Sequence, residues 1–181
     1  MAGNPGVLAE DRRLRKVAGC NVFTVGVFAW SRLEPEDGRY EFEWLDRVMD
    51  DLLADGCKAI LSTPTAARPA WLARKYPEVM RTDRDGRRED FSSRHNFCWS
   101  SPVFRKKARD IITRLAARYR SHPALGMWHL SNELGGNRGN GECFCGSCRQ
   151  KWHRWLEARY GSLDVLNTAW WSDFSAHRFT A

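Results

Sequence analysis

Apolar residues along the chain form two kinds of pattern, short continuous runs and longer stretches with helical spacing. The runs at 21–28 and 58–63 are rich in β-branched and aromatic residues and have few polar positions, which is typical of strands buried on both faces. From Trp44 to Asp55, apolar residues recur at i, i+3, i+4, i+7 and i+8, which predicts an amphipathic helix. A helix ending near Ala18 precedes the first run, and Ser101 as N-cap predicts another before the strand that runs from Pro123 toward Glu133.

The order of these elements repeats. The stretches 18–21 and 55–58 both read helix end, Gly, Cys, strand start, and they lie 37 residues apart, about one strand-loop-helix unit. Three such units predict an α/β fold with parallel strands. No Gly-x-Gly-x-x-Gly motif follows any of the strands, which argues against a dinucleotide-binding fold. We therefore expect part of a (β/α)8 barrel, since a whole one needs about 250 residues.

Two further helices are predicted beyond the third strand. One spans about 147–160 and is expected to bury Trp152, Trp155 and Leu156. A shorter one follows and begins at Ser162 as its N-cap. Cys20 and Cys57, at the starts of the first two strands, are interpreted as small buried apolar residues.

Composition narrows the functional classes. A hydrophobic content of 43% suffices for a core, and no apolar run approaches the roughly 20 residues of a membrane span. The net charge of +7 comes from basic residues that alternate with acidic ones, so nucleic-acid binding is not expected. The N-terminus lacks the features of a signal peptide, and the six cysteines then indicate reduced thiols or metal ligands in a cytoplasmic protein. The nine tryptophans favour a ligand-binding cleft without choosing the ligand.

The strand at 123–130 delivers Asn132 and Glu133 to a turn that Gly135 and Gly136 are expected to form. Glycoside cleavage needs a carboxyl group that stays protonated near neutral pH, and cover by apolar side chains at a strand end is one way to keep it so. An adjacent amide can donate a hydrogen bond to a sugar hydroxyl. The alternative is a solvated glutamate at a strand edge.

Four cysteines indicate a metal site. Cys143, Cys145 and Cys148 have C-x-C-x2-C spacing, and Cys98 could supply a fourth thiolate for tetrahedral zinc. Because four thiolates leave no open coordination position, such a zinc ion would be structural. The alternative is a set of reduced surface thiols.

Polar and aromatic residues also follow the first two strands. Trp30 and Arg32 come after the first, and Arg94 and His95 lie in the long loop after the second. Arg94 could donate to a sugar hydroxyl or form an ion pair with a loop carboxylate. His95 could act as a catalytic base or be structural.

With these residues in view, the chain resembles glycoside hydrolase family 42, the cytoplasmic β-galactosidases of clan A. The stretches that carry the resemblance cover nearly the whole chain in order: Phe28–Pro35, Thr63–Leu72, Lys75–Val79, Ser93–Asn96, Trp128–Glu133, the four cysteines, and Lys151–Trp171.

The resemblance implies a (β/α)8 domain that cleaves terminal β-D-galactosides with retention of configuration. It implies that Glu133 is the general acid/base, that Arg94 and Asn132 bind galactose, and that Cys98, Cys143, Cys145 and Cys148 hold zinc. It also implies that full-length members form homotrimers.

The chain departs from the family pattern in its extent. Residues 1–181 match about strands two to four, so the first strand, strands five to eight and the nucleophilic glutamate are expected to be missing. The isolated chain is therefore expected to be inactive. Residues 137–141 lengthen the loop after Glu133, and Phe174-Ser175 replaces a more aromatic sequence. The alternative function is a non-catalytic zinc-binding interaction module derived from a barrel.

Overall fold

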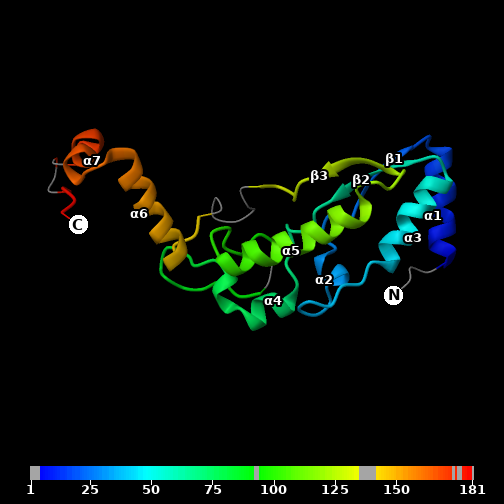
Figure 1. The fold of residues 1–181 in the computed structure, drawn as a ribbon, viewed down its shortest axis with the longest axis horizontal. Helices are drawn as coiled ribbons and strands as arrows, with labels where there is room; N and C mark the ends of the chain where they lie inside the picture. Colours follow the sequence, from blue (N-terminus) through cyan, green and yellow to red (C-terminus); the bar gives the residue numbers. More distant parts are fainter. Residues whose placement is uncertain (1–4, 92–93, 135–141, 173, 175–176, 181) are drawn as a thin grey trace.

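The computed structural model describes residues 5–91, 94–134, 142–172, 174 and 177–180. Helices and short parallel strands alternate along the chain (Figure 1). The elements are α1 (Pro5–Val17), β1 (Val22–Val25), α2 (Trp30–Leu33), α3 (Glu43–Ala54), β2 (Lys58–Ser62), α4 (Ala70–Lys75), the 3-10 helix η1 (Pro77–Val79), α5 (Pro102–Tyr119), β3 (Leu125–His129), α6 (Gly146–Tyr160) and α7 (Leu163–Trp170).

The three strands form one parallel sheet in the order β1-β2-β3, which confirms the predicted α/β arrangement. Val22 pairs with Lys58 at one end of the sheet, and Ser62 pairs with His129 at the other. Because all three strands run the same way, the loops that follow them leave from the same edge. The candidate polar residues lie in those loops.

The predicted helices form where their apolar spacing placed them. Leu45, Met49 and Leu52, at positions i, i+4 and i+7 of the predicted pattern, are buried on α3. At the start of α5, the Phe104 backbone N–H donates to Ser101 Oγ at 3.3 Å, which confirms the predicted N-cap. The same arrangement starts α7, where the Val165 N–H donates to Ser162 Oγ at 3.3 Å.

The described residues cover only one face of the sheet, and the prediction that the first strand is buried on both faces is wrong. Exposure alternates along β1, with Phe23 and Val25 packed against the core and Val22 51% exposed. Met127 on β3 is 62% exposed. Within the described residues, α3 and α5 contribute core residues on one face, so the pattern becomes that of a half-exposed sheet.

The two cysteines at the strand starts differ in exposure. Cys57 is buried as predicted, whereas Cys20 is exposed.

We call residues 5–134 the α/β body and residues 142–172 the α6–α7 arm. The arm extends away from the body, and α6 buries no side chain (Figure 1). Trp152 and Trp155 are each 48% exposed, so the predicted burial of these residues and of Leu156, which is only half-buried, is wrong. These residues do lie on one helix, as predicted, but no described element of the body covers the side of α6 that carries them.

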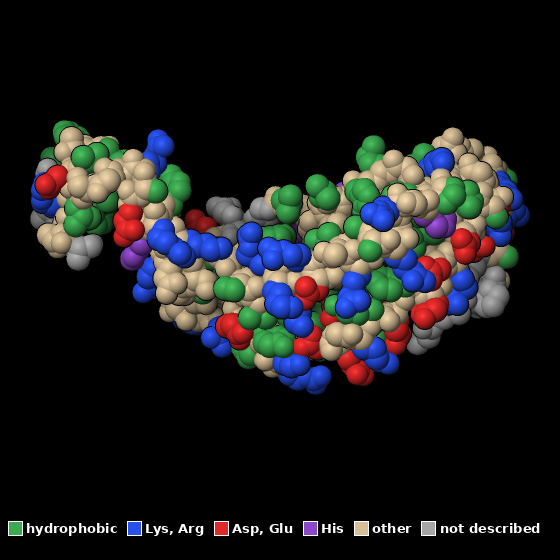
Figure 2. All heavy atoms as spheres, viewed as in Figure 1, with side chains coloured by type: hydrophobic (Ala, Val, Ile, Leu, Met, Phe, Trp, Pro, Cys, Tyr) green, Lys and Arg blue, Asp and Glu red, His purple; other side chains and the backbone are tan. Residues whose placement is uncertain are grey.

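Charged residues of both signs are interspersed on the face of the body in Figure 2, as expected for solvated helix surfaces. Within the described part of the chain, no helix has the length and apolar character needed to cross a membrane.

Candidate active site and metal centre

Hydrogen bonds join the carboxyl ends of β2 and β3. The Thr63 N–H donates to the His129 carbonyl at 2.9 Å, and the Ser131 N–H donates to Thr63 Oγ1 at 2.7 Å. The Ser62 hydroxyl lies 2.9 Å from His129 Nδ1. These contacts fix the point where the chain leaves β3, two residues before Glu133.

The backbone turns sharply at this point. Ser131 and Glu133 have positive φ angles of 59° and 47°, a left-handed conformation that is uncommon for residues other than glycine. The turn predicted at Gly135-Gly136 falls outside the described residues, as does the lengthened loop at 137–141. The change of direction therefore begins earlier than the glycines indicated, at Ser131, and includes the candidate acid.

Arg94 contacts Glu133. The guanidinium Nη2 lies 3.3 Å from Oε2 of the carboxylate. The guanidinium carbon Cζ of Arg94 also lies over the Phe28 ring, 4.5 Å from its centroid. These residues come from the loops after β2, β3 and β1 respectively. Arg94 therefore forms the ion pair with a loop carboxylate that the sequence allowed, and that carboxylate is the candidate acid. Its binding of a sugar hydroxyl stays a prediction. Asn132 is half-buried beside Glu133.

The expected apolar cover over Glu133 is not found among the described residues, since its side chain is 54% exposed. Trp30 does not line a cleft either. It is fully buried and donates its indole N–H to Glu34 Oε2 at 2.8 Å. Arg32 packs over the Trp44 ring at 4.4 Å. The residues after β1 therefore serve mainly the core, apart from Phe28.

Sequence reasoning missed the residues that join the strand ends. Thr63, Ser131 and His129 come together only through the parallel pairing of β2 with β3. Their position at or just past the ends of predicted strands indicated that they lie at the same edge of the sheet. Which of them contact one another depends on the register of β2 and β3, which the sequence did not give.

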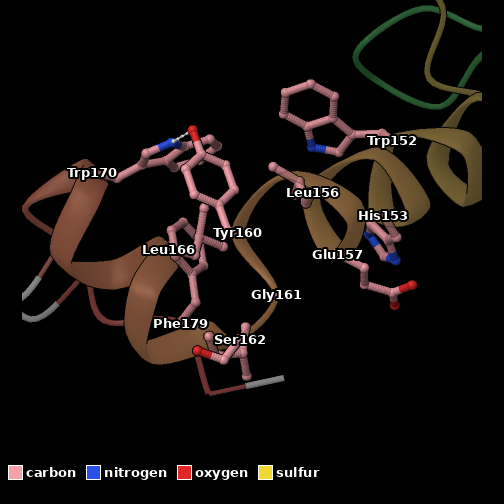
Figure 3. Close-up of a pocket in the computed structure, with 11 residues that line it drawn as sticks. Trp152, His153, Leu156, Glu157, Tyr160, Gly161, Ser162, Leu166, Trp170 and Phe179 are labelled. Atoms are coloured by element: carbon pink, nitrogen blue, oxygen red, sulfur yellow. Dashed lines mark hydrogen bonds between the residues drawn. The ribbon is translucent and has the colours of Figure 1, made fainter.

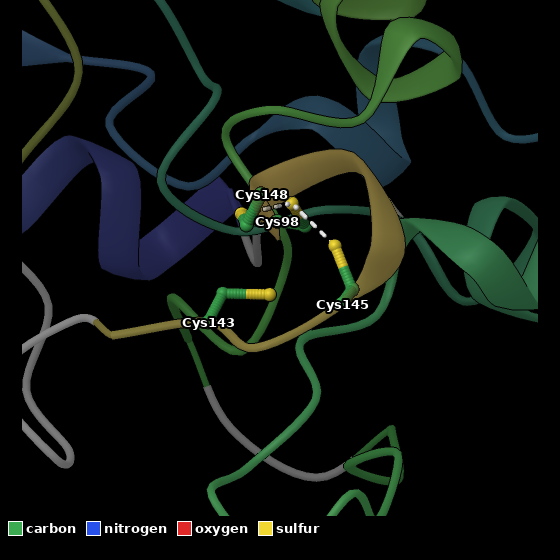
Figure 4. A group of neighbouring side chains, drawn as sticks. All are labelled: Cys98, Cys143, Cys145 and Cys148. Carbon is green, nitrogen blue, oxygen red and sulfur yellow. Dashed lines mark hydrogen bonds between the residues drawn. The ribbon is translucent and has the colours of Figure 1, made fainter. Parts of the chain in front are cut away.

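The four predicted cysteines form one cluster (Figure 4). Their Sγ atoms all lie within 4.8 Å of one another, and Cys98 Sγ is 3.4 Å from both Cys145 Sγ and Cys148 Sγ. Tetrahedral Zn–S bonds of about 2.3 Å separate neighbouring sulfurs by about 3.8 Å. The donor set and its spacing therefore fit a metal ion such as zinc.

The surroundings of the cluster favour thiolates. Hydrogen bonding with Cys98 and the backbone N–H of Thr82 lower the pKa of Cys143 to about 4, against the effect of burial. The pKa of Cys98 is raised in turn by the thiol of Cys143 and by burial. The lowered pKa of Cys143 favours its thiolate, and a bound cation would favour loss of the proton from Cys98 as well.

A separate pocket of about 450 Å³ lies between α6 and α7 (Figure 3). Its wall includes Trp152, Tyr160, Trp170 and Phe179, and the Trp170 indole N–H donates to the Tyr160 hydroxyl at 2.9 Å. It contains none of the candidate catalytic residues. Helical spacing, which placed the tryptophans of α6 in a core, did not predict it.

A family model described as β-galactosidase, glycoside hydrolase 42, matches residues 3–181. The chain belongs to glycoside hydrolase family 42. Among the relatives of this family 42 chain is the β-galactosidase BglY of Alicyclobacillus acidocaldarius, 47% identical over 176 residues, which are 97% of this chain and 25% of BglY.

Solved structures agree with this family 42 assignment. Gan42B, a GH42 β-galactosidase from G. stearothermophilus, is 50% identical with a TM-score of 0.93, and the match covers 98% of this chain and 25% of Gan42B. The catalytic domain of a β-amylase from Paenibacillus polymyxa is 15% identical with a TM-score of 0.60 and covers 96% of this chain and 48% of that domain, which shows a likeness of fold alone. The chain spans about a quarter of the length of the family 42 proteins it matches, and its open sheet corresponds to part of their barrel.

Proposed function

We propose that the chain carries the acid/base half of a retaining β-galactosidase active site. The observation that carries this proposal is the contact between Arg94 and Glu133 at the carboxyl edge of the sheet. It brings a carboxyl group and a hydroxyl-binding cation together at the edge where (β/α)8 enzymes hold their substrates. The names of the β-galactosidase relatives support a terminal β-galactoside as the substrate.

In this proposal Glu133 acts twice. It gives its proton to the leaving glycosidic oxygen, and it later takes a proton from the water that releases the galactose. The amide of Asn132 binds a galactose hydroxyl near the reacting carbon, and Arg94 binds another. A hydroxyl bound to Arg94 turns the guanidinium away from Glu133, so that substrate binding frees the carboxyl group for proton transfer.

A retaining mechanism needs a second carboxyl group about 5 Å from the first as nucleophile. We place it outside these 181 residues, which we assign to about strands two to four of the barrel. The match to a quarter of each relative supports this assignment. The isolated chain is then expected to release no product from an aryl β-galactoside.

The four cysteines would hold zinc in a closed thiolate site that leaves no position for substrate, so its role is structural. The reduced cluster supports a reducing, cytoplasmic location. The family resemblance supports a homotrimer for the whole enzyme.

The test is a chimera in which these 181 residues replace the matching quarter of Gan42B. We expect it to cleave an aryl β-galactoside, and we expect Glu133→Gln to lower kcat/KM by about 100-fold or more, because general acid/base groups contribute on that scale. Glu43→Gln, at an exposed glutamate of α3, is the matched control and should leave the rate unchanged.

A second measurement identifies the role of the carboxyl group. Azide needs no base to attack the galactosyl-enzyme, so Glu133→Ala with azide should form a β-galactosyl azide of retained configuration. Full activity of Glu133→Gln, or a folded chimera without turnover, would contradict the proposal and favour the zinc-binding interaction module.

A further inference from the structure

The His95 ring is buried beside the proposed site, and the described part of the chain gives it no hydrogen bond of normal geometry. It follows Arg94 in the loop after β2 and is only 4% exposed. Neither ring nitrogen forms a hydrogen bond of normal geometry within the described residues. Buried polar atoms are paired in the great majority of cases, so a buried imidazole of this kind needs a physical reason.

The backbone holds the ring in this position. His95 has a positive φ of 59°, a left-handed conformation that is uncommon for residues other than glycine and tends to occur at functional sites. The next residue is fixed on both sides, because Asn96 Nδ2 donates to the Asp90 carbonyl at 2.5 Å and the Arg81 N–H donates to the Asn96 carbonyl at 2.9 Å. The Phe97 ring packs edge-on against the imidazole, with the centroids 6.2 Å apart.

The groups that act on the ring belong to the proposed site. Burial and the positive charge of Arg94 lower the pKa of His95, while the backbone of Asn132 and the charge of Glu133 act in the opposite direction. A lowered pKa favours the neutral ring, which has one N–H donor and one acceptor nitrogen. The contact of Arg94 with Glu133 brings the adjacent residues His95 and Asn132 into the same part of the site. The Asn132 backbone acts on the ring as an acceptor does, which points to its carbonyl oxygen.

We propose that His95 is a positioning residue that donates its ring N–H to the Asn132 carbonyl and so holds the turn carrying Glu133. This inference rests on the proposed acid/base role of Glu133. His95 and Glu133 are both left-handed residues. The proposed hydrogen bond would link the first of them to the carbonyl of Asn132, which directly precedes the second. It also answers the question left open by the sequence, because His95 then transfers no proton to the sugar.

The test uses the same chimera with two substitutions of similar size. His95→Leu keeps the packing against Phe97 but has no donor, and His95→Gln restores an N–H at similar reach. We expect His95→Leu to lower kcat by about tenfold to 100-fold with KM changed less than about twofold, because small misplacements of a catalytic group cost that much. We expect His95→Gln to recover most of the rate. His153→Gln, at an exposed histidine of α6, is the control.

A double substitution separates positioning from a general effect on folding. Combined with Glu133→Ala, His95→Leu should have almost no further effect on the azide reaction, because the group that it positions has been removed. Equal losses in both backgrounds would overturn the inference, as would a rise in KM at constant kcat or a failure of His95→Gln to recover the rate. If His95→Leu does not fold, His95→Asn takes its place, since its shorter amide falls short of Asn132.

These outcomes remain distinct from those of the proposed function. An active Glu133→Gln chimera would overturn the acid/base role of Glu133, and with it the reason for positioning that residue. An inactive Glu133→Gln chimera with equal His95→Leu losses in both backgrounds would overturn only the role of His95.

Discussion

The α/β body and the α6–α7 arm use similar helices in different ways. In the body, the apolar faces of α3 and α5 meet the covered face of the sheet and form a continuous core. In the arm, α6 buries no side chain, and its tryptophans stack on each other, with the Trp152 and Trp155 rings 5.0 Å apart. Helical spacing therefore determines which face of a helix is apolar. A second element has to be present before that face becomes a core.

The contacts that join the two regions are polar and lie at the base of the arm. The Phe144 N–H donates to the Thr82 carbonyl at 2.9 Å, and the Thr82 N–H donates to Cys143 Sγ at 3.5 Å. Cys98, which is fully buried in the body, lies against the thiols of Cys145 and Cys148. The cysteine cluster thus provides the main connection between body and arm. Three experiments test how the two regions differ.

The largest effect is expected from removing a metal ion held by the four cysteines. A chelator or Cys98→Ser should release the arm, because binding free energy at a structural thiolate site is also folding free energy. Amide hydrogen exchange in α6 and α7 should rise by about tenfold or more, while that in β2 should change little. Metal content should fall with Cys98→Ser and persist with Cys20→Ser, an exposed cysteine outside the cluster. Equal protection of α6 with and without metal would contradict this connection.

The next effect concerns packing. Leu61 is fully buried on the central strand, so Leu61→Ala should lower the free energy of unfolding by about 2 to 5 kcal/mol. Leu163→Ala removes the same atoms from a residue of α7 that is 40% exposed and should cost less than about 1 kcal/mol. Urea unfolding followed by circular dichroism measures both. Similar shifts in the two midpoints would show that the arm has a core of its own.

The smallest effect depends on pH. Burial raises the pKa of Asp37, but hydrogen bonds from Lys107, Lys75 and Tyr76 outweigh it and bring the pKa down to about 2. A lowered carboxyl pKa stabilises the fold above the unfolded value and ceases to do so as pH falls through the folded value. The body should therefore lose about 1 to 2 kcal/mol between about pH 4 and pH 2.

Asp37→Asn should remove that part of the acid dependence. Asp164→Asn is the matched control in the arm, because Asp164 is 83% exposed in its ion pair with Arg178 and such pairs contribute little. Unfolding midpoints between pH 2 and pH 6 would show the difference. Identical profiles for Asp37→Asn and the unsubstituted chain would assign the acid sensitivity to another group.

Local patterns in the sequence predicted most of the secondary structure. The spacing of Leu45, Met49 and Leu52 is set within one helix, and the caps at Ser101 and Ser162 act on the first turn of their own helices. The parallel sheet followed from the repeat of such units. The exposure of β1 and α6 was not predictable in this way, because it depends on what lies against them.

The candidate site was predictable in its residues more than in its contacts. Cysteine spacing correctly predicted that the four thiols come together, in an arrangement that could hold a metal ion. The contact of Arg94 with Glu133 joins residues 39 positions apart and depends on how the loop after β2 folds back. The burial of His95 depends on the same loop, whose mixed polar and aromatic sequence has no regular period.

A metal ion bound by the four cysteines would also affect the unfolded chain. Cys98 and Cys145 are separated by 47 residues, a stretch that contains all of α5 and β3. A metal bound by both would close that stretch into a loop. If the loop-closure entropy of a disulfide cross-link applies equally to a metal cross-link, closing a loop of this length removes chain entropy equivalent to about 4 kcal/mol. The strand that leads to Glu133 lies inside the loop. The centre would thus limit how far β3 can separate from α5 in any partly unfolded state in which the ion stays bound.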